Sequence, residues 1–253
     1  MRPHAILAAT ALLTLAASTV HAQAPADSLT PLQTSVACAL PPATSSGPPA
    51  DALLVIGAQD TVLRRLFNQR DLLIINGGSA KGVQIGQQYF VRRRDGFGIT
   101  SANGSPHAVR TGGWIQIVAV NDTTAIATVE HSCDGMFEGD FLEPFVAPVV
   151  PPGADRADTS GTPDFASLGR VLYGDQERRT GAIGEYMLID RGADQGVSPG
   201  AHFAVYRDLG AGGLPLASIG ELTVVSIGPT MAVARINLAR DAVQSGDFVV
   251  PRK

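Results

Sequence analysis

The chain has 253 residues and a formal net charge of −4 at neutral pH, and 45% of its residues are hydrophobic. This length can accommodate two domains of modest size. The mildly acidic balance excludes the broad basic surface that nucleic-acid-binding proteins present to phosphates, so we expect no nucleic-acid partner.

The first residues have the pattern of an export signal. A single arginine precedes a long apolar run over residues 5–17. Val20 and Ala22 then supply short side chains at the positions that a signal peptidase reads, so residues 1–22 are predicted to be a signal peptide, with Ala24 as an alternative cleavage site. An anchoring helix is the other interpretation, but the run is short for a membrane span and lacks a flanking basic stop signal. We therefore expect a periplasmic or secreted protein without a transmembrane segment.

Two stretches of small residues and prolines divide the rest of the chain. Residues 23–50 are rich in Pro, Ala, Ser and Thr and cannot bury enough apolar surface to fold alone, so they are predicted to form a tether. Residues 147–162 are rich in Pro and Gly and are predicted to form a linker. The segments 51–146 and 163–253 remain as two β units, each near the lower end of ordinary domain size.

The two units repeat one pattern. At an offset of 114 residues the matches are Ile75/Ile189, Gly78/Gly192, Gly82/Gly196, Val83/Val197, Gly86/Gly200, Val91/Val205 and Arg93/Arg207. At an offset of 107 they are Gly113/Gly220, Val118/Val225, Ala125/Ala232, Ala127/Ala234, Asp134/Asp241, Gly139/Gly246, Asp140/Asp247, Phe141/Phe248 and Pro144/Pro251. The length difference falls in the loop around Asn103-Gly104, a predicted tight turn. Since glycines, aliphatics and turn residues dominate the matches, the repeat describes a scaffold.

Apolar residues alternate with period two inside each unit, which predicts strands. In the first unit we expect strands over 53–57, 72–75, 88–93, 114–120 and 125–129 and a closing strand that begins at 139–140. In the second we expect them over 169–174, 186–189, 202–207, 221–227 and 231–236, with a closing strand from 246–247. Many short strands without a long helix predict an all-β protein with two tandem copies of a small antiparallel β-barrel or sandwich.

Each unit contains a glycine triplet after its second strand. The triplets are Gly78, Gly82 and Gly86, and Gly192, Gly196 and Gly200. A phosphate-binding loop would need a following helix, and here a strand follows. We therefore predict structural turns in which at least one glycine of each triplet has a positive φ.

The two cysteines, Cys38 and Cys133, are predicted to pair because export favours oxidation. Lipidation of Cys38 is an alternative, although the residue lies far beyond the apolar run. His131, Cys133 and Asp134 suggest a metal site, but no second cluster supplies the remaining ligands of a zinc ion. Catalysis by Cys133 would need a base, and no candidate is evident. We predict neither a metal nor another cofactor.

Residues 188–193 superficially resemble the aspartic-protease signature. Those enzymes need two facing carboxylates, whereas the first copy has Asn76 where the second has Asp190. We therefore expect Asp190 to be a turn residue that closes a strand, and we expect no enzymatic activity.

Arg92, Arg93 and Arg94 form the densest positive charge in the chain. They are candidates for contact with carboxylates or phosphates of envelope polymers. The alternative is an edge strand that is protected from aggregation by its charges. Only Arg93 has a counterpart in the second copy, Arg207, which favours a role of that pair in the fold.

Both copies contain the pattern Gly-x-x-x-Gly-Val-x-x-Gly-x-x-Phe/Tyr-x-Val-x-Arg, and the second continues with Gly-x-Leu-x-Val-Val and ends in Gly-Asp-Phe-Val. This pattern resembles the C-terminal β module of the flagellar assembly protein T, as found in bacterial envelope proteins. The resemblance covers residues 72–145 and 186–251. It implies a non-catalytic, envelope-associated binding or assembly module and transfers no functional residue.

The sequence thus predicts an exported, non-enzymatic scaffold or protein-interaction module of the cell envelope, whose partner is an envelope protein or a cell-wall polymer. The alternative function is binding of peptidoglycan or another envelope polysaccharide. An enzyme would require a polar site that is assembled between the two copies.

Overall fold

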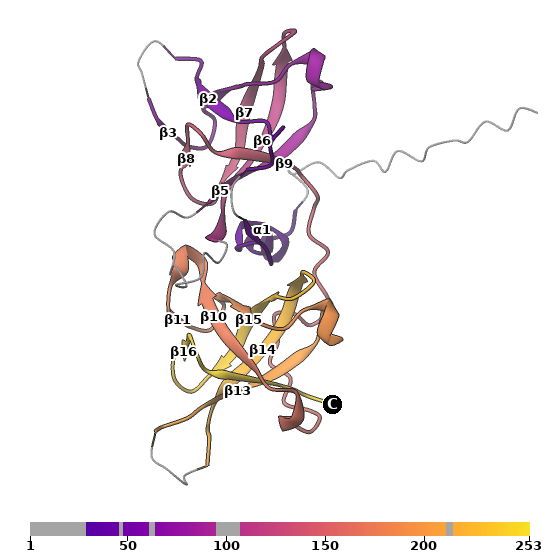
Figure 1. Cartoon of the computed structure of the whole chain (residues 1–253), viewed down its shortest axis with the longest axis vertical. Helices are drawn as coiled ribbons and strands as arrows, with labels where there is room; N and C mark the ends of the chain where they lie inside the picture. Colours follow the sequence, from indigo (N-terminus) through magenta and orange to yellow (C-terminus); the bar gives the residue numbers. More distant parts are fainter. Residues whose placement is uncertain (1–28, 46–47, 61–63, 95–106, 211–214) are drawn as a thin grey trace, which may run out of the picture.

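The computed structural model describes residues 29–45, 48–60, 64–94, 107–210 and 215–253. These residues form two β modules stacked along the long axis of the molecule, with a short helix between them (Figure 1). The prediction of an all-β, two-module protein is confirmed. The predicted signal peptide and the Asn103-Gly104 turn lie outside the described residues.

The first module, barrel one, is an antiparallel sheet of seven strands within the described residues, in the order β2-β4-β7-β6-β5-β9 with β1 paired to β6. An isolated bridge between Leu54 and Phe141 brings its two edges together. The strands are β1 (Thr44–Ser45), β2 (Val55–Ala58), β4 (Leu72–Ile75), β5 (Gln88–Arg94), β6 (His107–Val120), β7 (Ala125–Ser132) and β9 (Phe141–Pro144). A small ribbon pairs β3 (Leu66–Phe67) with β8 (Met136–Phe137), and a 3₁₀ turn spans Ser79–Lys81.

The second module, barrel two, is a closed barrel in the order β10-β12-β15-β14-β13-β17. Its strands are β10 (Gly169–Gly174), β12 (Tyr186–Ile189), β13 (His202–Arg207), β14 (Ala217–Ile227), β15 (Ala232–Ala239) and β17 (Phe248–Pro251). The ribbon of β11 (Thr180–Gly181) and β16 (Val243–Gln244) corresponds to β3 and β8, and 3₁₀ turns span Phe165–Ser167, Asp175–Glu177 and Ala193–Gln195. The strand order matches that of barrel one, which confirms that the repeats are two copies of one fold.

Each barrel has its own core, because the inward residues of its alternating strands are aliphatic. In barrel one Ile75, Val91, Ile115 and Ala127 belong to this core, and Ile189, Val205, Leu222 and Ala234 take those places in barrel two. Burial of each large aliphatic side chain contributes roughly 1.5–3 kcal/mol to folding. The period of two therefore determines which residues point outward and remain available for other contacts.

The glycine triplets serve two structural purposes. Gly82 and Gly196 both have a φ of 77°, and Gly86 and Gly200 have φ values of 86° and 87°, so the prediction of positive φ is confirmed. Gly78 and Gly192 have extended backbones instead. They are needed for space, since a Cβ at Gly78 would overlap the carbonyl oxygen of Asn121 and one at Gly192 would lie 2.5 Å from the backbone nitrogen of Met231.

An arginine–aspartate pair closes the same corner of each barrel. In barrel one Arg93 donates two hydrogen bonds of 2.7 Å to the buried carboxylate of Asp140 and one to the carbonyl of Gly135. In barrel two Arg207 donates two bonds of 2.8 Å to Asp247. Bidentate pairing satisfies a buried carboxylate and fixes its geometry. This repetition places Arg93 in the fold, as its counterpart Arg207 suggested.

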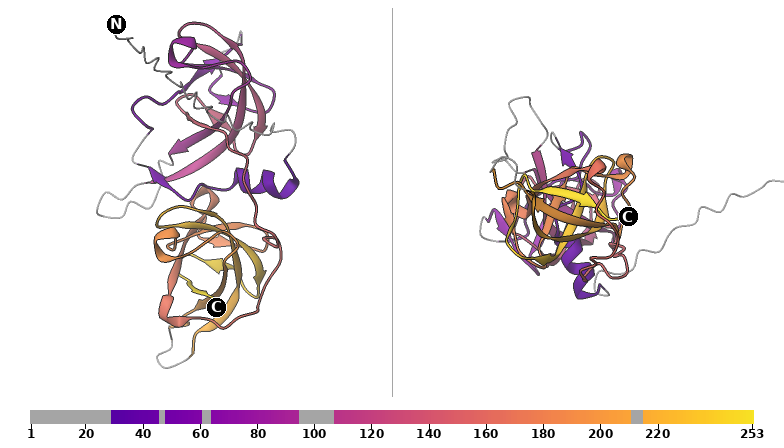
Figure 2. Two further views of the ribbon diagram at one scale, coloured as in Figure 1. Left: turned by 90° about the vertical axis from the view of Figure 1, so that its right-hand side faces the viewer. Right: turned by 90° about the horizontal axis from the view of Figure 1, so that it is seen from below.

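The segment predicted as a tether is partly folded, which corrects that expectation. Residues Pro31–Cys38 form helix α1, which lies between the two barrels in both side views (Figure 1; Figure 2, left). Thr30 and Gln33 form a capping box, and Pro31 occupies the first turn, where its missing N–H has no cost. The apolar side chains of this segment are buried against both barrels.

The segment predicted as a linker also packs against the protein. Ala154 is fully buried, and the side-chain amide of Asn237 donates to the carbonyls of Ala154 and Arg156. Further along, Thr162 and Lys253 exchange two backbone hydrogen bonds. The predicted linker therefore lies along barrel two over residues 154–162.

Candidate functional site

One side of α1 packs against the outer surface of barrel two. Val36, together with Ala39 and Leu40 just beyond the helix, is buried in one cluster with residues of β10, β12, β14 and β15. The hydroxyl groups of Ser35 and Tyr186 are 2.8 Å apart. We call this surface the covered face of barrel two; it comprises Leu172, Tyr186, Leu188, Val225 and Val233.

The other side of α1 packs against barrel one. Ala37 is buried with Phe90, Trp114 and Phe145. The predicted disulfide is confirmed, since Cys38 at the end of α1 is bonded to Cys133 after β7, with a Cα–Cα distance of 5.3 Å. Covalent and apolar contacts therefore fix α1 on barrel one while it also contacts barrel two.

The internal repeat identifies the equivalent of the covered face on barrel one. Leu72 and Ile74 lie 114 residues before Tyr186 and Leu188, and Val118 and Ile126 lie 107 residues before Val225 and Val233. Ile56 corresponds to Leu172 by strand register, because Val55 pairs with Ile75 as Val171 pairs with Ile189. We call the surface of Ile56, Leu72, Ile74, Val118 and Ile126 the open face of barrel one.

The open face is a continuous patch on neighbouring strands. Ile74 of β4 is directly opposite Ile126 of β7. Val118 lies at a register shift between β6 and β7, and Val225 lies at the same shift in barrel two. Neighbouring outward side chains of adjacent strands contact one another, so the five aliphatic residues form one apolar surface.

The open and covered faces differ in exposure. On the open face Ile56 is 43% exposed, Leu72 38% and Val118 42%, whereas on the covered face Val225 is 3% exposed and Leu188 is fully buried. Ile74 and Ile126 are half-buried by their neighbours. Grouped exposed aliphatic side chains of this kind mark interaction surfaces more often than isolated ones do.

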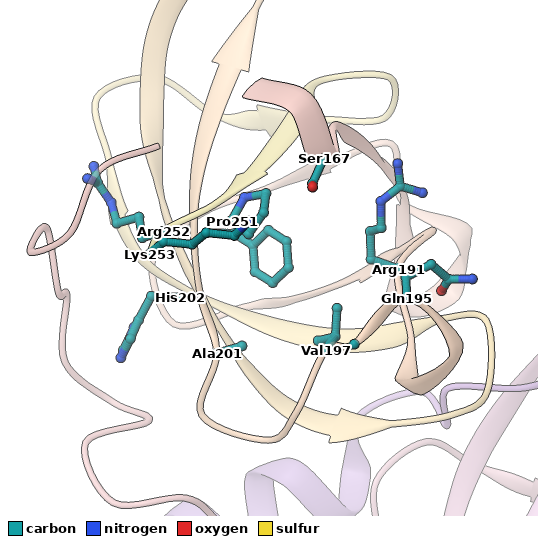
Figure 3. Close-up of a pocket in the computed structure, with 11 residues that line it drawn as sticks. Ser167, Arg191, Gln195, Val197, Ala201, His202, Pro251, Arg252 and Lys253 are labelled. Carbon is teal, nitrogen blue, oxygen red and sulfur yellow. The ribbon is translucent and has the colours of Figure 1, made fainter. Parts of the chain in front are cut away.

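A second candidate site is a cavity of about 490 Å³ at one end of barrel two. Figure 3 shows Arg191 and Gln195 on one side of it, His202 and Arg252 on the opposite side, and the Ser167 hydroxyl between them. This volume lies within the range of small-ligand pockets.

The charges around the cavity are largely neutralised by the protein. Arg252 donates hydrogen bonds of 2.9 and 2.6 Å to the carboxylate of Glu221, and the Lys253 amine is 2.6 Å from the carboxylate of Asp164. One ring nitrogen of His202 is 3.0 Å from the hydroxyl of Thr223. The cavity is therefore polar without a strong excess of positive charge, which suits a hydroxyl-rich ligand better than a multiply charged anion.

The three arginines predicted as anion contacts have different surroundings. Arg92 is 7% exposed, donates to Glu143 at 3.1 Å and to Thr111, and lies over the ring of Phe90. Burial lowers the pKa of Arg92, although a guanidinium keeps its charge in proteins. Arg93 is bonded to Asp140, and Arg94 is exposed at the end of β5. Contact with an external anion stays a prediction.

Two further groups singled out in the sequence have structural partners. Asp190 accepts a hydrogen bond from the backbone nitrogen of Arg170, and Asn76 accepts the equivalent bond from Leu54 in barrel one. Asp190 directly follows the end of β12, as predicted, but its carboxylate bonds to the neighbouring strand β10 and not within its own turn. His131 stacks on Trp114, where burial lowers the pKa of His131, and its ring lies near the cysteine sulfurs. Because those sulfurs are bonded to each other, they offer no thiolate to a metal.

The sequence matches no protein-family model and no curated protein. None of the helices in the described residues has the length and apolarity that a membrane crossing requires. Sequence reasoning did not identify the open face, although a signal was present. All five of its residues are aliphatic, and four of them match apolar residues of the second copy at the constant repeat offsets.

Proposed function

We propose that this chain is an exported, non-enzymatic scaffold of the bacterial cell envelope, in which barrel one docks another protein through its open face. The single observation that supports this role is the apolar open face, whose counterpart in barrel two is covered within the same chain. A disulfide-linked protein is compatible with an oxidising compartment such as the periplasm.

A photo-crosslinking amino acid at position 118 tests the proposed role in cells that produce the protein. We expect discrete crosslinked products of defined mass, because the Val118 side chain is 42% exposed on β6, within the proposed docking surface. The matched control carries the same amino acid at position 183, since Ile183 is 58% exposed on barrel two. Equal products from both positions, or none from position 118, would contradict the proposal.

The alternative function is binding of peptidoglycan or another envelope polysaccharide, and the cavity of barrel two favours it. Arg191 and Gln195 can donate hydrogen bonds to sugar hydroxyls. The Ser167 hydroxyl, which donates to Asp164, can accept one. The volume of the cavity lies in the range of small-ligand pockets. Retention of the purified protein on cell-wall sacculi, lost on Arg191→Ala but kept in Val118→Lys, would favour this alternative over protein docking.

A further inference from the structure

Among the residues that the structure describes, no segment packs on the three exposed side chains of the open face, Ile56, Leu72 and Val118, whereas the end of α1 packs on the covered face. The covered face therefore shows what such a surface accommodates. Val36 lies in the last turn of α1, and Ala39 and Leu40 follow the helix, with Ala39 in an extended conformation. The end of the helix and the residues after it thus present three small or medium apolar side chains to this surface. The receiving surface consists of aliphatic outward residues of four neighbouring strands, β10, β12, β15 and β14, and one aromatic ring.

We propose that the open face of barrel one binds a segment of a partner protein built like residues 31–40 of this chain, a short helix that ends in an extended residue, with small and medium aliphatic side chains at that end. This inference rests on the proposed docking function and names its occupant. The residues that support it are the five aliphatic residues of the open face. They are equivalent to the residues of barrel two that cluster with the end of α1.

The difference between the faces specifies the partner further. On the covered face the Tyr186 hydroxyl is 2.8 Å from that of Ser35. Leu72 replaces Tyr186 on the open face and offers no hydroxyl. A serine at this place of the partner helix would lose its hydrogen-bonding partner on docking, which is costly for a buried hydroxyl. The partner helix should therefore have an aliphatic residue or alanine where α1 has Ser35.

The probe for this inference is a synthetic peptide of residues 29–42, with a hydrocarbon staple that joins positions 34 and 38. These positions lie on the opposite side of the helix from Val36, and the staple is needed because so short a helix is marginal in water. A second peptide also carries Ser35→Leu. Fluorescence anisotropy measures the binding of each labelled peptide to the full-length, oxidised protein.

We expect both peptides to bind and Ser35→Leu to bind several-fold more tightly. Leu72→Lys combined with Val118→Lys should weaken binding by at least about tenfold, the equivalent of 1.4 kcal/mol. Both side chains are well exposed, so these variants should fold; if Leu72→Lys does not, Ile56→Lys replaces it. The control Ile183→Lys changes an equally apolar, exposed site on barrel two and should leave binding unchanged.

Absence of peptide binding at millimolar concentration would overturn the inference, as would equal loss of binding in Ile183→Lys. If crosslinking through position 118 nevertheless persists in cells, the docking function stands and only its helical occupant is wrong. Analytical ultracentrifugation gives a third possible result, in which the protein sediments as a dimer and Val118→Lys dissociates it. That result would identify a second copy of the chain as the occupant of the open face and would likewise overturn the inference.

Discussion

Replacing both Cys38 and Cys133 by alanine is expected to lower the free energy of unfolding by roughly 4–5 kcal/mol. The disulfide links residues 95 positions apart, so its removal restores a large conformational entropy to the unfolded chain. It also releases the end of α1 from barrel one. Urea denaturation followed by the fluorescence of Trp114, the single tryptophan, measures the change, since this buried ring belongs to the same cluster as Cys38.

Reducing agent provides the control for this prediction. It should destabilise the unmodified protein to a similar extent and leave the double alanine variant unaffected. A loss of less than about 1 kcal/mol in the double variant would mean that α1 is held on barrel one by its apolar contacts alone.

Leu40→Asp is also expected to lower the free energy of unfolding strongly. Leu40 is 5% exposed in the cluster with Tyr186 and Val225, so the substitution removes apolar contacts and places a carboxylate in an apolar site. We expect a loss of roughly 3–5 kcal/mol. Because the disulfide still holds α1 on barrel one, the loss should fall on the contact with barrel two.

Differential scanning calorimetry distinguishes this outcome from general destabilisation. Leu40→Asp should divide the unfolding transition into two, one for each barrel. Ile183→Asp is the matched control, since it introduces the same charge at an exposed aliphatic residue of barrel two and should leave the transition unchanged. A single, uniformly shifted transition in Leu40→Asp would contradict a local effect on the contact.

Sequence patterns predicted the strands well because their determinants are local. The period of two distinguishes inward residues such as Ile189 from outward ones such as Leu188, and the second copy confirms each assignment at a constant offset. Gly82 and Gly196 were predictable for the same reason, since a turn between strands that requires positive φ favours glycine.

The ordered connecting segments were missed because distant contacts stabilise them. Helix α1 has only eight residues, too few for stability in isolation. Its capping box at Thr30 was readable in the sequence, but the two barrel surfaces that bury it come from residues far along the chain. Ala154 is similar, because its burial depends on Asn237 and neighbours that no local pattern indicates.

Both the sequence and the structure were needed to identify the open face. The sequence places aliphatic residues such as Val118 and Val225 at equivalent positions, but only the structure shows that α1 covers one surface and not the other. Period-two alternation assigns outward residues to solvent by default. Outward residues that another segment covers, such as Val225, are recognised only when the two copies are compared in three dimensions.

The central claim is that α1 joins the two barrels, because the comparison of a covered with an open face depends on it. Calorimetry of the unmodified, oxidised protein tests this claim most directly. Because α1 is buried against both barrels, we expect one cooperative transition whose calorimetric and van't Hoff enthalpies agree. Two independent transitions would contradict the claim that α1 joins the barrels. The covered face would then no longer indicate what binds to barrel one.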